Sequence, residues 1–430
     1  MTQTERLCRT AYILGEVCYC QEKTSLISPA KANRRFAPAT RGPLAVLRFA
    51  CHVAHHRRPA LCLTYIPIYA IFPAIFSSGG RTYLIHKTKS KAAHADSAVP
   101  SDFARKIPSL PGACDPFSYV AEELELVEQN LARAIRSREQ ALTDIAAHLI
   151  QGGGKRVRPV VTLLAFLAFD GKRTQDIVDI ATSIELIHTA TLLHDDIIDG
   201  AEIRRGKESA FKKFGLKSTL VAGDFLFIKA FEFAGKFDET VVQWTADACA
   251  LLTEGEMLQG FFNRNCDVTL ADYVEIVKRK TASLFQTGAK VGAYLAGANS
   301  ALVEQADRYG LNMGIAFQMI DDILDIVGHL ELLGKPTGMD LRDGNPSLPI
   351  IVSLNEGESA VGEAFKQARP SEDQITAALE AIKAGPAIQQ AKALSKHYAE
   401  EALRSLRKFP PSRYRNGLKT LVQLIIDRDF

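Results

Sequence analysis

The sequence contains two copies of one acidic pattern, D-D-x-x-D, embedded in apolar stretches. The first copy lies in LLHDDIIDG and the second in FQMIDDILDIVG. The six acidic residues are Asp195, Asp196, Asp199, Asp321, Asp322 and Asp325. In a helix the first and last aspartates of each copy share a face, and like charges four residues apart are destabilising. Unpaired carboxylates in apolar surroundings cost far more. The pattern therefore predicts that cations lie against both triads.

A carboxylate cluster without His or Cys is a hard-oxygen site, which favours Mg²⁺ over zinc and accepts Mn²⁺ as a substitute. Mg²⁺ held by a few carboxylates keeps its other positions for water and substrate phosphates. A diphosphate or oligophosphate ligand is therefore expected. One such motif alone would fit a solvated acidic helix end equally well. Two copies on two apolar helices argue against that reading, because burying six uncompensated acids would be prohibitive.

A basic turn, GGGKRVRP at residues 152–159, precedes an apolar helical stretch. Its glycines offer bare backbone N–H groups, and Lys155, Arg156 and Arg158 supply three cations, as an anion cradle requires. The spacing of a Walker A loop is absent. Alone, the turn would fit a solvated basic loop as well.

Further cations follow at separate points of the chain. Arg204 and Arg205 come just after the first acidic motif and suit bidentate phosphate contacts. Lys280, beside Thr281, and Lys335 add further donors. Cations thus accompany both acidic motifs, as a phosphate ligand would require.

Hydrophobic periodicity predicts an all-α body from about residue 115 to residue 430. Residues 121–150 repeat apolar side chains every three to four positions before three glycines end the run. Comparable runs cover 157–169, 174–199, 217–235, 238–260, 270–296, 301–327, 372–384, 387–407 and 412–427. No stretch alternates with the period of a strand. We expect one domain of about ten helices, packed as an elaborated bundle with functional side chains pointing inward.

Residues 1–100 differ from this body. The whole chain carries a net charge of +3, but residues 1–95 hold 14 Lys and Arg against three acids, which leaves the rest acidic. An acidic body argues against nucleic-acid binding. The segment is read as a disordered basic extension, an organelle transit segment or an upstream translated stretch. Its cysteines and histidines lack zinc-site spacing, and Pro67 and Pro73 argue against a spanning helix at 59–78. A cytoplasmic location is expected, or an organelle if the segment is a transit signal.

Six motifs in order resemble those of the trans-polyprenyl diphosphate synthase family, most closely its octaprenyl and other long-chain members, and the resemblance spans residues 115–430. They are GGGKRVRP, LLHDDIIDGAEIRRG, GDFL, KTASLF, FQMIDDILD and GKPTGMDLRDGNPSLP. The resemblance implies the isoprenoid synthase-type helical bundle around a central cavity. It implies an enzyme that condenses isopentenyl diphosphate with an allylic diphosphate, head to tail and all-trans, with a cluster of three Mg²⁺ ions.

The resemblance also implies roles for single residues. The six aspartates would serve the metal cluster, chiefly Asp195, Asp199 and Asp321. The isopentenyl diphosphate would be held by Lys155, Arg158, His188 and Arg205. The allylic diphosphate would be held by Arg204, Lys280 and Lys335. Thr281 and Gln318 would shield the allylic cation, and Phe317 would line the substrate site. The departing diphosphate would take the proton. Without the motif context, His188 would be read as a satisfied core histidine.

One position departs from the family pattern. Many relatives have a second lysine in the closing loop where this chain has Asn345. A neutral amide weakens the expected diphosphate contact, and Arg342 is the nearby cation that could compensate. Activity is still expected.

Product length should depend on Thr191 and Ala190, four and five residues before the first motif aspartate, where the growing chain extends one helical turn away. Short-product relatives carry a bulky aromatic side chain there, and these two side chains are small. Leu186, Ile187 or Phe166 could close the tunnel lower down. A product of roughly seven to ten isoprene units is expected, with a geranylgeranyl or farnesyl product as the alternative.

Three rival functions fit less well. A class I terpene cyclase has an NSE-type second metal motif and lacks the Lys155 and Arg158 cradle. A non-catalytic subunit of a heteromeric synthase typically loses one aspartate triad. A structural helical protein with acidic stripes explains neither motif. Family members are mostly homodimers, and the apolar run at 217–235 could supply the interface. At most peripheral membrane association is expected.

Overall fold

The computed structural model describes residues 115–328 and 337–427. The chain divides into two compact units, Met1–Ala93 and His94–Phe430, and every described residue lies in the second. The predictions for residues 1–100 and for Lys335 therefore fall outside the described residues.

Long helices make up most of the described chain, and the all-α prediction is confirmed. They are α2 (Ala121–Ala134), α3 (Gln140–Ile150), α4 (Val157–Ala168), α5 (Thr174–Ile198), α7 (Leu216–Ala234), α8 (Glu239–Phe262), α10 (Ser283–Leu295), α11 (Ser300–Val327), α16 (Glu372–Ala384), α17 (Ala387–Leu406) and α18 (Arg413–Ile426). Most bounds lie within two residues of those predicted from periodicity.

Short elements complete the unit. They are a 3₁₀ helix η3 (Ser118–Val120), α6 (Ala210–Phe214), α9 (Leu270–Val277), a π-helix η4 (Lys278–Ala282), α13 (Met339–Asp343), α14 (Leu348–Asn355) and α15 (Ser359–Lys366). The strands of the described ranges are β1 (Ile203–Arg204) and β2 (Lys207–Glu208), which form one antiparallel hairpin. The short helices α6, α13, α14 and α15 were not predicted from the sequence.

Two predicted continuous helices are interrupted. The run at 121–150 breaks between α2 and α3, where the Ser137 N–H donates to Thr143 Oγ1 at 3.0 Å and the Glu139 N–H donates to Ser137 Oγ at 3.2 Å. Side chains that bond the backbone locally compete with the helical pattern. The run at 270–296 changes to π geometry at Lys278–Ala282 before α10 begins. Apolar spacing continues through both interruptions, so periodicity alone could not find them.

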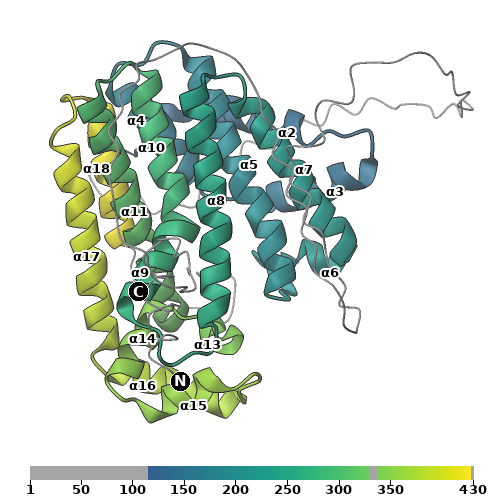
Figure 1. The fold of residues 1–430 in the computed structure, drawn as a ribbon, viewed down its shortest axis with the longest axis vertical. Helices are drawn as coiled ribbons and strands as arrows, with labels where there is room; N and C mark the ends of the chain where they lie inside the picture. Colours follow the sequence, from purple (N-terminus) through teal and green to yellow (C-terminus); the bar gives the residue numbers. More distant parts are fainter. Residues whose placement is uncertain (1–114, 329–336, 428–430) are drawn as a thin grey trace, which may run out of the picture. The chain divides into compact units, whose positions relative to one another are not determined.

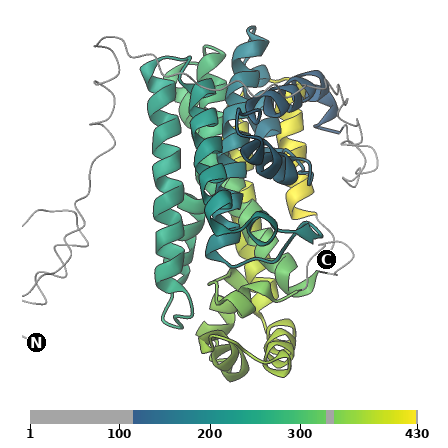
Figure 2. The ribbon, with the colours of Figure 1, turned by 90° about the vertical axis from the view of Figure 1, so that its right-hand side faces the viewer.

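The core is centred on α4, whose sequence VRPVVTLLAFLA is apolar on nearly every side. A helix that is apolar all round is stable only when other helices cover it on every side. It packs against α5, α10 and α18, while α11 packs against α10 and α17. Figures 1 and 2 show these long helices running in roughly one direction, with α13, α14, α15 and α16 gathered at one end.

Glycines let the helices around η4 approach closely. A Cβ on Gly255 of α8 would lie 2.5 Å from the Lys280 amide nitrogen. On α11, a Cβ on Gly310 would lie 2.4 Å from the Phe285 carbonyl oxygen, and one on Gly314 would lie 2.6 Å from the Ala282 Cα. The segment from Lys280 to Phe285 is thus clamped by backbone contacts from two sides.

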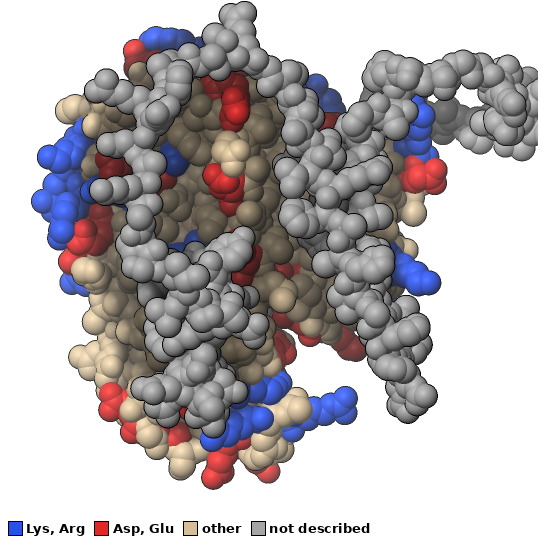
Figure 3. Space-filling view, in the orientation of Figure 1, with Lys and Arg blue, Asp and Glu red and all other residues tan. Residues whose placement is uncertain are grey.

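Charged side chains are unevenly spread on the face seen in Figure 3. Acidic groups lie along its middle, and Lys and Arg lie mainly toward its edges. Among the described helices, none has both the length and the apolar character that crossing a bilayer requires.

We predict that Gly310→Ala destabilises the protein by about 1–3 kcal/mol, because the new methyl group meets a backbone carbonyl that cannot turn away. The matched control is Gly260→Ala in α8, where nothing lies within 4 Å of the added Cβ. There the better helix propensity of alanine should stabilise by up to about 1 kcal/mol. Urea unfolding measures both changes. Equal stability of the two variants would contradict the close approach described above.

Candidate functional site

The first aspartate triad lies at the C-terminal end of α5. Asp195 is half-buried, Asp196 is 0% exposed, and Asp199 is the exposed C-cap residue. The carboxylates of Asp195 and Asp199 are close enough to repel each other. The predicted pairing of these two residues on one helix face is therefore present.

The middle aspartate of this triad is held by the protein. Arg204, on β1 of the hairpin, donates from Nε to Asp196 Oδ1. The hairpin turns tightly because Arg205 and Gly206 both adopt positive φ, 53° and 73°. The second carboxylate oxygen, Asp196 Oδ2, is buried without a hydrogen-bond partner. Asp196 was expected among the metal ligands and Arg204 among the diphosphate contacts, and in this structure the two groups bind each other.

Lys280, from the π-helix, supplies positive charge to the acidic end of α5. Its Nζ pairs with Glu256 of α8. Burial raises the pKa of Asp195 to about 7, with Glu256 and Asp199 adding to the rise and Lys280 opposing it. Burial disfavours charge on Lys280 too, yet Asp195, Glu256 and Asp199 outweigh it and raise its pKa. Glu256 was not predicted from the sequence, since nothing in EGEMLQG distinguishes it from a surface acid.

The second triad lies on α11, and its members have different surroundings. Asp322 is 5% exposed and accepts hydrogen bonds from Tyr273 Oη at 2.7 Å, Gln318 Nε2 at 2.9 Å and the Leu348 N–H at 3.0 Å. Asp325 is also buried and accepts from the Asp340 N–H at 3.1 Å. Asp321 is half-exposed and lies within electrostatic range of Arg158.

The two residues expected to shield an allylic cation are in contact. Thr281 Oγ1 donates to Gln318 Oε1 at 2.9 Å, joining the π-helix to α11. Phe317, the preceding residue, packs against Phe285 with ring centroids 5.3 Å apart. Lys280 faces the first triad while its neighbour Thr281 reaches the helix of the second. The π-helix therefore links the two acidic motifs.

One of the three cations of the basic turn, Arg156, forms ion pairs inside the protein. Arg156 is buried and donates to Glu128 Oε1 at 2.6 Å and to Glu185 Oε1 at 2.7 Å. Its backbone adopts φ 48° at the N-cap of α4. Two carboxylates thus already pair with Arg156, and its part in an anion cradle stays a prediction. Glu128 and Glu185, which are distant from Arg156 in the sequence, neutralise the charge of Arg156. The spacing of residues in the basic turn does not reveal this pairing.

Two further arginines form a positive basin beside His188, defined here as Arg158, Arg205 and His188. Burial lowers the pKa of His188 well below its usual value, and Arg158, Arg205 and Arg204 lower it further. Burial also lowers the pKa of Arg158, against the pull of Glu185 and Asp321. Arg158 lies 4.8 Å over the Phe285 ring, and its buried Nε has no hydrogen-bond partner. Converging cations with an unsatisfied donor suit an anionic ligand.

The other predicted residues are placed as follows. Lys155 is exposed at the start of the turn. Ala190 is fully buried on α5, and Thr191 is half-buried and donates from Oγ1 to the His188 carbonyl at 2.8 Å. The glycine of GDFL, Gly223, is where α7 meets His194, whose Nε2 would lie 2.2 Å from an added Cβ.

The closing-loop position is occupied by a structural contact. Asn345 Oδ1 accepts from Gln259 Nε2 at 3.1 Å and from Asn263 Nδ2 at 3.4 Å, both on or next to α8. The guanidinium of Arg342 pairs through two nitrogens with Glu372 of α16, at 2.5 and 2.8 Å. Arg342 also lies within electrostatic range of Asp325 of the second motif. Its replacement of the missing lysine therefore stays a prediction.

The donor set fits a magnesium ion that shares its ligands with phosphate. Asp195, Asp199 and Asp321 are the triad members that solvent reaches, and they are hard oxygen donors. Within residues 115–328 and 337–427, no three His, Cys, Asp or Glu side chains lie close enough to enclose a metal ion by themselves. Water and substrate phosphates would have to complete the coordination, as is usual for Mg²⁺.

We predict that Asp195→Asn stabilises the metal-free protein more at pH 8 than at pH 5. A raised folded-state pKa means that stability is greatest when the carboxyl is protonated and is lost as the pH rises toward about 7. Asparagine cannot ionise, so the variant does not lose stability in this way as the pH rises. Thermal unfolding in EDTA at both pH values measures the effect, with the exposed Asp170→Asn as control. An equal Tm difference at the two pH values would contradict the burial of Asp195.

Comparisons with known proteins show the family of the chain. A family model described as polyprenyl synthetase matches residues 139–382. Heptaprenyl diphosphate synthase component 2 of Geobacillus stearothermophilus is 36% identical over 73% of this chain and 98% of its own length. The chloroplastic solanesyl-diphosphate synthase 2 of Oryza sativa subsp. japonica is 29% identical over 98% of this chain and 96% of its own length.

A solved structure has the same fold. The polyprenyl synthase of Caulobacter crescentus, complexed with calcium and isoprenyl diphosphate, has a TM-score of 0.70 and 33% identity over 73% of this chain and 97% of that chain. The family model covers more than half of the chain, and the resemblance seen in the motifs is confirmed. The chain belongs to the polyprenyl synthetase family of prenyltransferases.

Proposed function

We propose that this enzyme condenses isopentenyl diphosphate with an allylic diphosphate, head to tail and all-trans, and releases diphosphate. The observation that carries the proposal is the presence of two anion sites built differently. One is the acidic end of α5 with Lys280, which needs a metal ion to accept a phosphate. The other is the arginine basin around His188, which binds an anion without one. Two diphosphate substrates require two such sites.

At the acidic site, Asp195, Asp199 and Asp321 would hold Mg²⁺, three ions by the family pattern, with Mn²⁺ as substitute. When bound, the metal would neutralise the allylic diphosphate as it leaves the carbon chain. Lys280 pairs with Glu256 within electrostatic range of Asp195 and Asp199, and it would contact the same phosphate oxygens. Arg204 and Lys335 would complete this grip.

After the bond to the leaving group breaks, the allylic cation needs neutral oxygen dipoles nearby. The Thr281 hydroxyl and the Gln318 amide oxygen are held together at 2.9 Å and would supply them. Phe317 and Phe285 form the apolar wall beside them. A dry wall excludes water, which would otherwise quench the cation.

At the basic site, Arg158 and Arg205, with Lys155, would bind isopentenyl diphosphate by charge. Burial, and then the surrounding arginines, lower the pKa of His188 well below its usual value, so it would act through hydrogen bonding rather than charge. The double bond would then face the allylic cation, and the departing diphosphate would accept the proton lost. Catalysis would consist mainly of positioning and electrostatics.

A long-chain product is the favoured outcome. The relatives described above are named for heptaprenyl and solanesyl products. The small side chains of Ala190 and Thr191 leave the extension side of α5 without an aromatic floor. Asn345 tethers the closing loop to α8 in place of a lysine, and the remaining cations Lys280 and Arg204 would carry the allylic phosphate contact.

We predict that the purified protein elongates farnesyl diphosphate with isopentenyl diphosphate and Mg²⁺, and that EDTA abolishes the reaction. Ala190→Tyr should shorten the product ladder, because the ring blocks the growing chain; Ala377→Tyr, at an exposed position of α16, should not. Chromatography of radiolabelled products measures both. An unchanged ladder in a folded Ala190→Tyr protein would refute the tunnel direction.

The parent enzyme also distinguishes the rival functions. A cyclised product would favour a terpene cyclase, and the absence of any product would favour a non-catalytic subunit.

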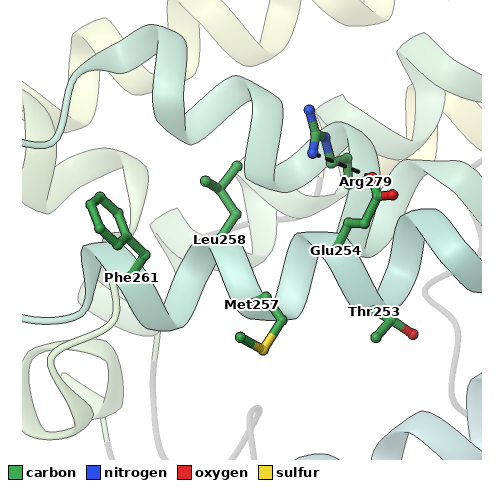
Figure 4. A pocket seen from close by; sticks show the side chains of 6 residues that line it. All are labelled: Thr253, Glu254, Met257, Leu258, Phe261 and Arg279. Atoms are coloured by element: carbon green, nitrogen blue, oxygen red, sulfur yellow. Dashed lines mark hydrogen bonds and ion pairs between the residues drawn. The ribbon is translucent and has the colours of Figure 1, made fainter. Parts of the chain in front are cut away.

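We propose a homodimer formed through α7 and α8. Seven exposed large apolar residues lie on these two adjacent helices: Leu216, Leu220, Val221, Ile228, Phe231, Met257 and Phe261. Figure 4 shows Met257 and Phe261 on α8, lining a surface groove with Leu258 and with the linked pair Glu254 and Arg279. Their exposed fractions, 72% and 73%, are costly in water. The name of the Geobacillus relative makes a second, different subunit the alternative partner.

We predict that the double variant Ile228→Glu/Phe261→Glu is monomeric while the parent protein has twice the mass of one chain. Charges buried at an interface without partners oppose association. Leu126→Glu on α2, also exposed, is the control and should stay dimeric. Light scattering after size exclusion measures the mass. A parent protein of single-chain mass, or a dimeric double variant, would contradict the interface.

We further propose that residues 1–100 direct the protein to an organelle, in place of the cytoplasmic location first expected. The match to the relative named chloroplastic extends over 98% of this chain and so includes part of this basic, acid-poor segment.

A further inference from the structure

A chain of hydrogen bonds runs behind the two residues expected to face the cation. Tyr273 Oη, from α9, donates to Asp322 Oδ2 at 2.7 Å. Gln318 Nε2 donates to Asp322 Oδ1 at 2.9 Å, and Thr281 Oγ1 donates to Gln318 Oε1 at 2.9 Å. The Leu348 N–H, at the start of α14, donates to Asp322 Oδ2 at 3.0 Å. Asp322 therefore joins α9, α11 and α14 directly, and η4 through Gln318.

The direction of these bonds follows from the chemistry of the groups. An ionised carboxylate only accepts, whereas an amide has one accepting and one donating end. Asp322 must therefore face the NH₂ end of Gln318, and its carbonyl end must point to Thr281. A flipped amide would set two oxygens against each other at Asp322. The aspartate thus determines which end of Gln318 is presented beside Thr281.

The surroundings of Asp322 differ from those of a metal ligand. It is 5% exposed, and both of its oxygens accept hydrogen bonds from protein donors. The tyrosine, the amide and the backbone donor occupy three of the roughly four acceptor positions of the carboxylate, and solvent hardly reaches the fourth. Asp321, the preceding residue, is half-exposed and faces the charge of Arg158. Identical residue types in one motif therefore have different environments.

We propose that Asp322 and Tyr273 are positioning residues that orient the Gln318 amide toward the allylic cation, and that Asp322 is not a metal ligand. This inference rests on the proposed function, because the oriented oxygen matters only if a cation forms there. Tyr273 acts indirectly. Its hydroxyl fixes the Asp322 carboxylate by a hydrogen bond, and that carboxylate fixes the orientation of the Gln318 amide.

The first test compares Tyr273→Phe with Tyr309→Phe. Both tyrosines are buried, and the Tyr309 hydroxyl donates to the Leu418 carbonyl at 3.0 Å, in a contact that does not involve the aspartate motifs. Tyr273→Phe should lower kcat on the order of tenfold, with KM for both substrates and the Mg²⁺ half-saturation within about twofold of the parent values. Tyr309→Phe should leave all three within about twofold. A Tyr273→Phe enzyme with parent kcat would overturn the proposal.

A double-mutant cycle tests whether Tyr273 acts through the amide. Once Gln318→Leu has removed the amide, adding Tyr273→Phe should lower kcat by less than about twofold. Independent, multiplying effects would overturn the proposed relay. Thermal unfolding of each variant identifies any loss of activity that comes from loss of fold.

A binding measurement separates positioning from metal ligation. Calorimetric titration with inorganic diphosphate and Mg²⁺ should give parent-like affinity for Asp322→Asn and at least about tenfold weaker affinity for Asp321→Asn. Equal losses in the two variants would overturn the proposal and leave the proposed function standing. If the parent enzyme makes no prenyl product, the proposed function fails, and the inference fails with it because no cation then forms for Gln318 to face.

Discussion

The placement of Lys280 against carboxylates from two helices is the interaction on which the site depends. Asp195 and Asp199 of α5 and Glu256 of α8 lie within electrostatic range of Lys280 and of one another, and without a cation these carboxylates would tend to take up protons. One ammonium group does not neutralise three acids, and the pKa of Asp195 is raised chiefly by burial and further by Glu256 and Asp199. Negative charge therefore remains uncompensated at this site, and divalent metal ions can neutralise it.

The opposite imbalance lies two helical turns away on the same helix. His188 precedes Asp195 by seven residues, so the two side chains share a face of α5. Around His188 the arginines outnumber their acidic partners, and burial, followed by these arginines, lowers the pKa of the imidazole. Buried Arg156, bound to Glu128 and Glu185, anchors the turn that carries Arg158. One helix thus connects a region that attracts cations with a region that attracts anions.

The π-helix makes this arrangement possible. In this segment, Lys280 reaches Glu256 of α8 and Thr281 reaches Gln318 of α11. Insertions of π geometry in α-helices are frequent at functional sites, because they redirect successive side chains. The glycines at positions 255, 310 and 314 let the neighbouring helices approach the backbone here. Packing and chemistry therefore depend on the same few residues.

The sequence alone determined the helices and the chemistry of the site, because apolar spacing fixes which face of a helix is buried and the repeated aspartates demand cations whatever their surroundings. It also determined that Asp195 and Asp199 share a face. The tertiary structure decided which charges remain available to a ligand. Arg156 was counted as a cradle cation, and Glu128 and Glu185 already pair with it. Asp196 and Asp322 have the same motif positions, but one meets an arginine from a hairpin and the other meets donors from three elements. The partner of a buried polar group comes from a segment distant in sequence, and residue spacing within one helix holds no information about that segment.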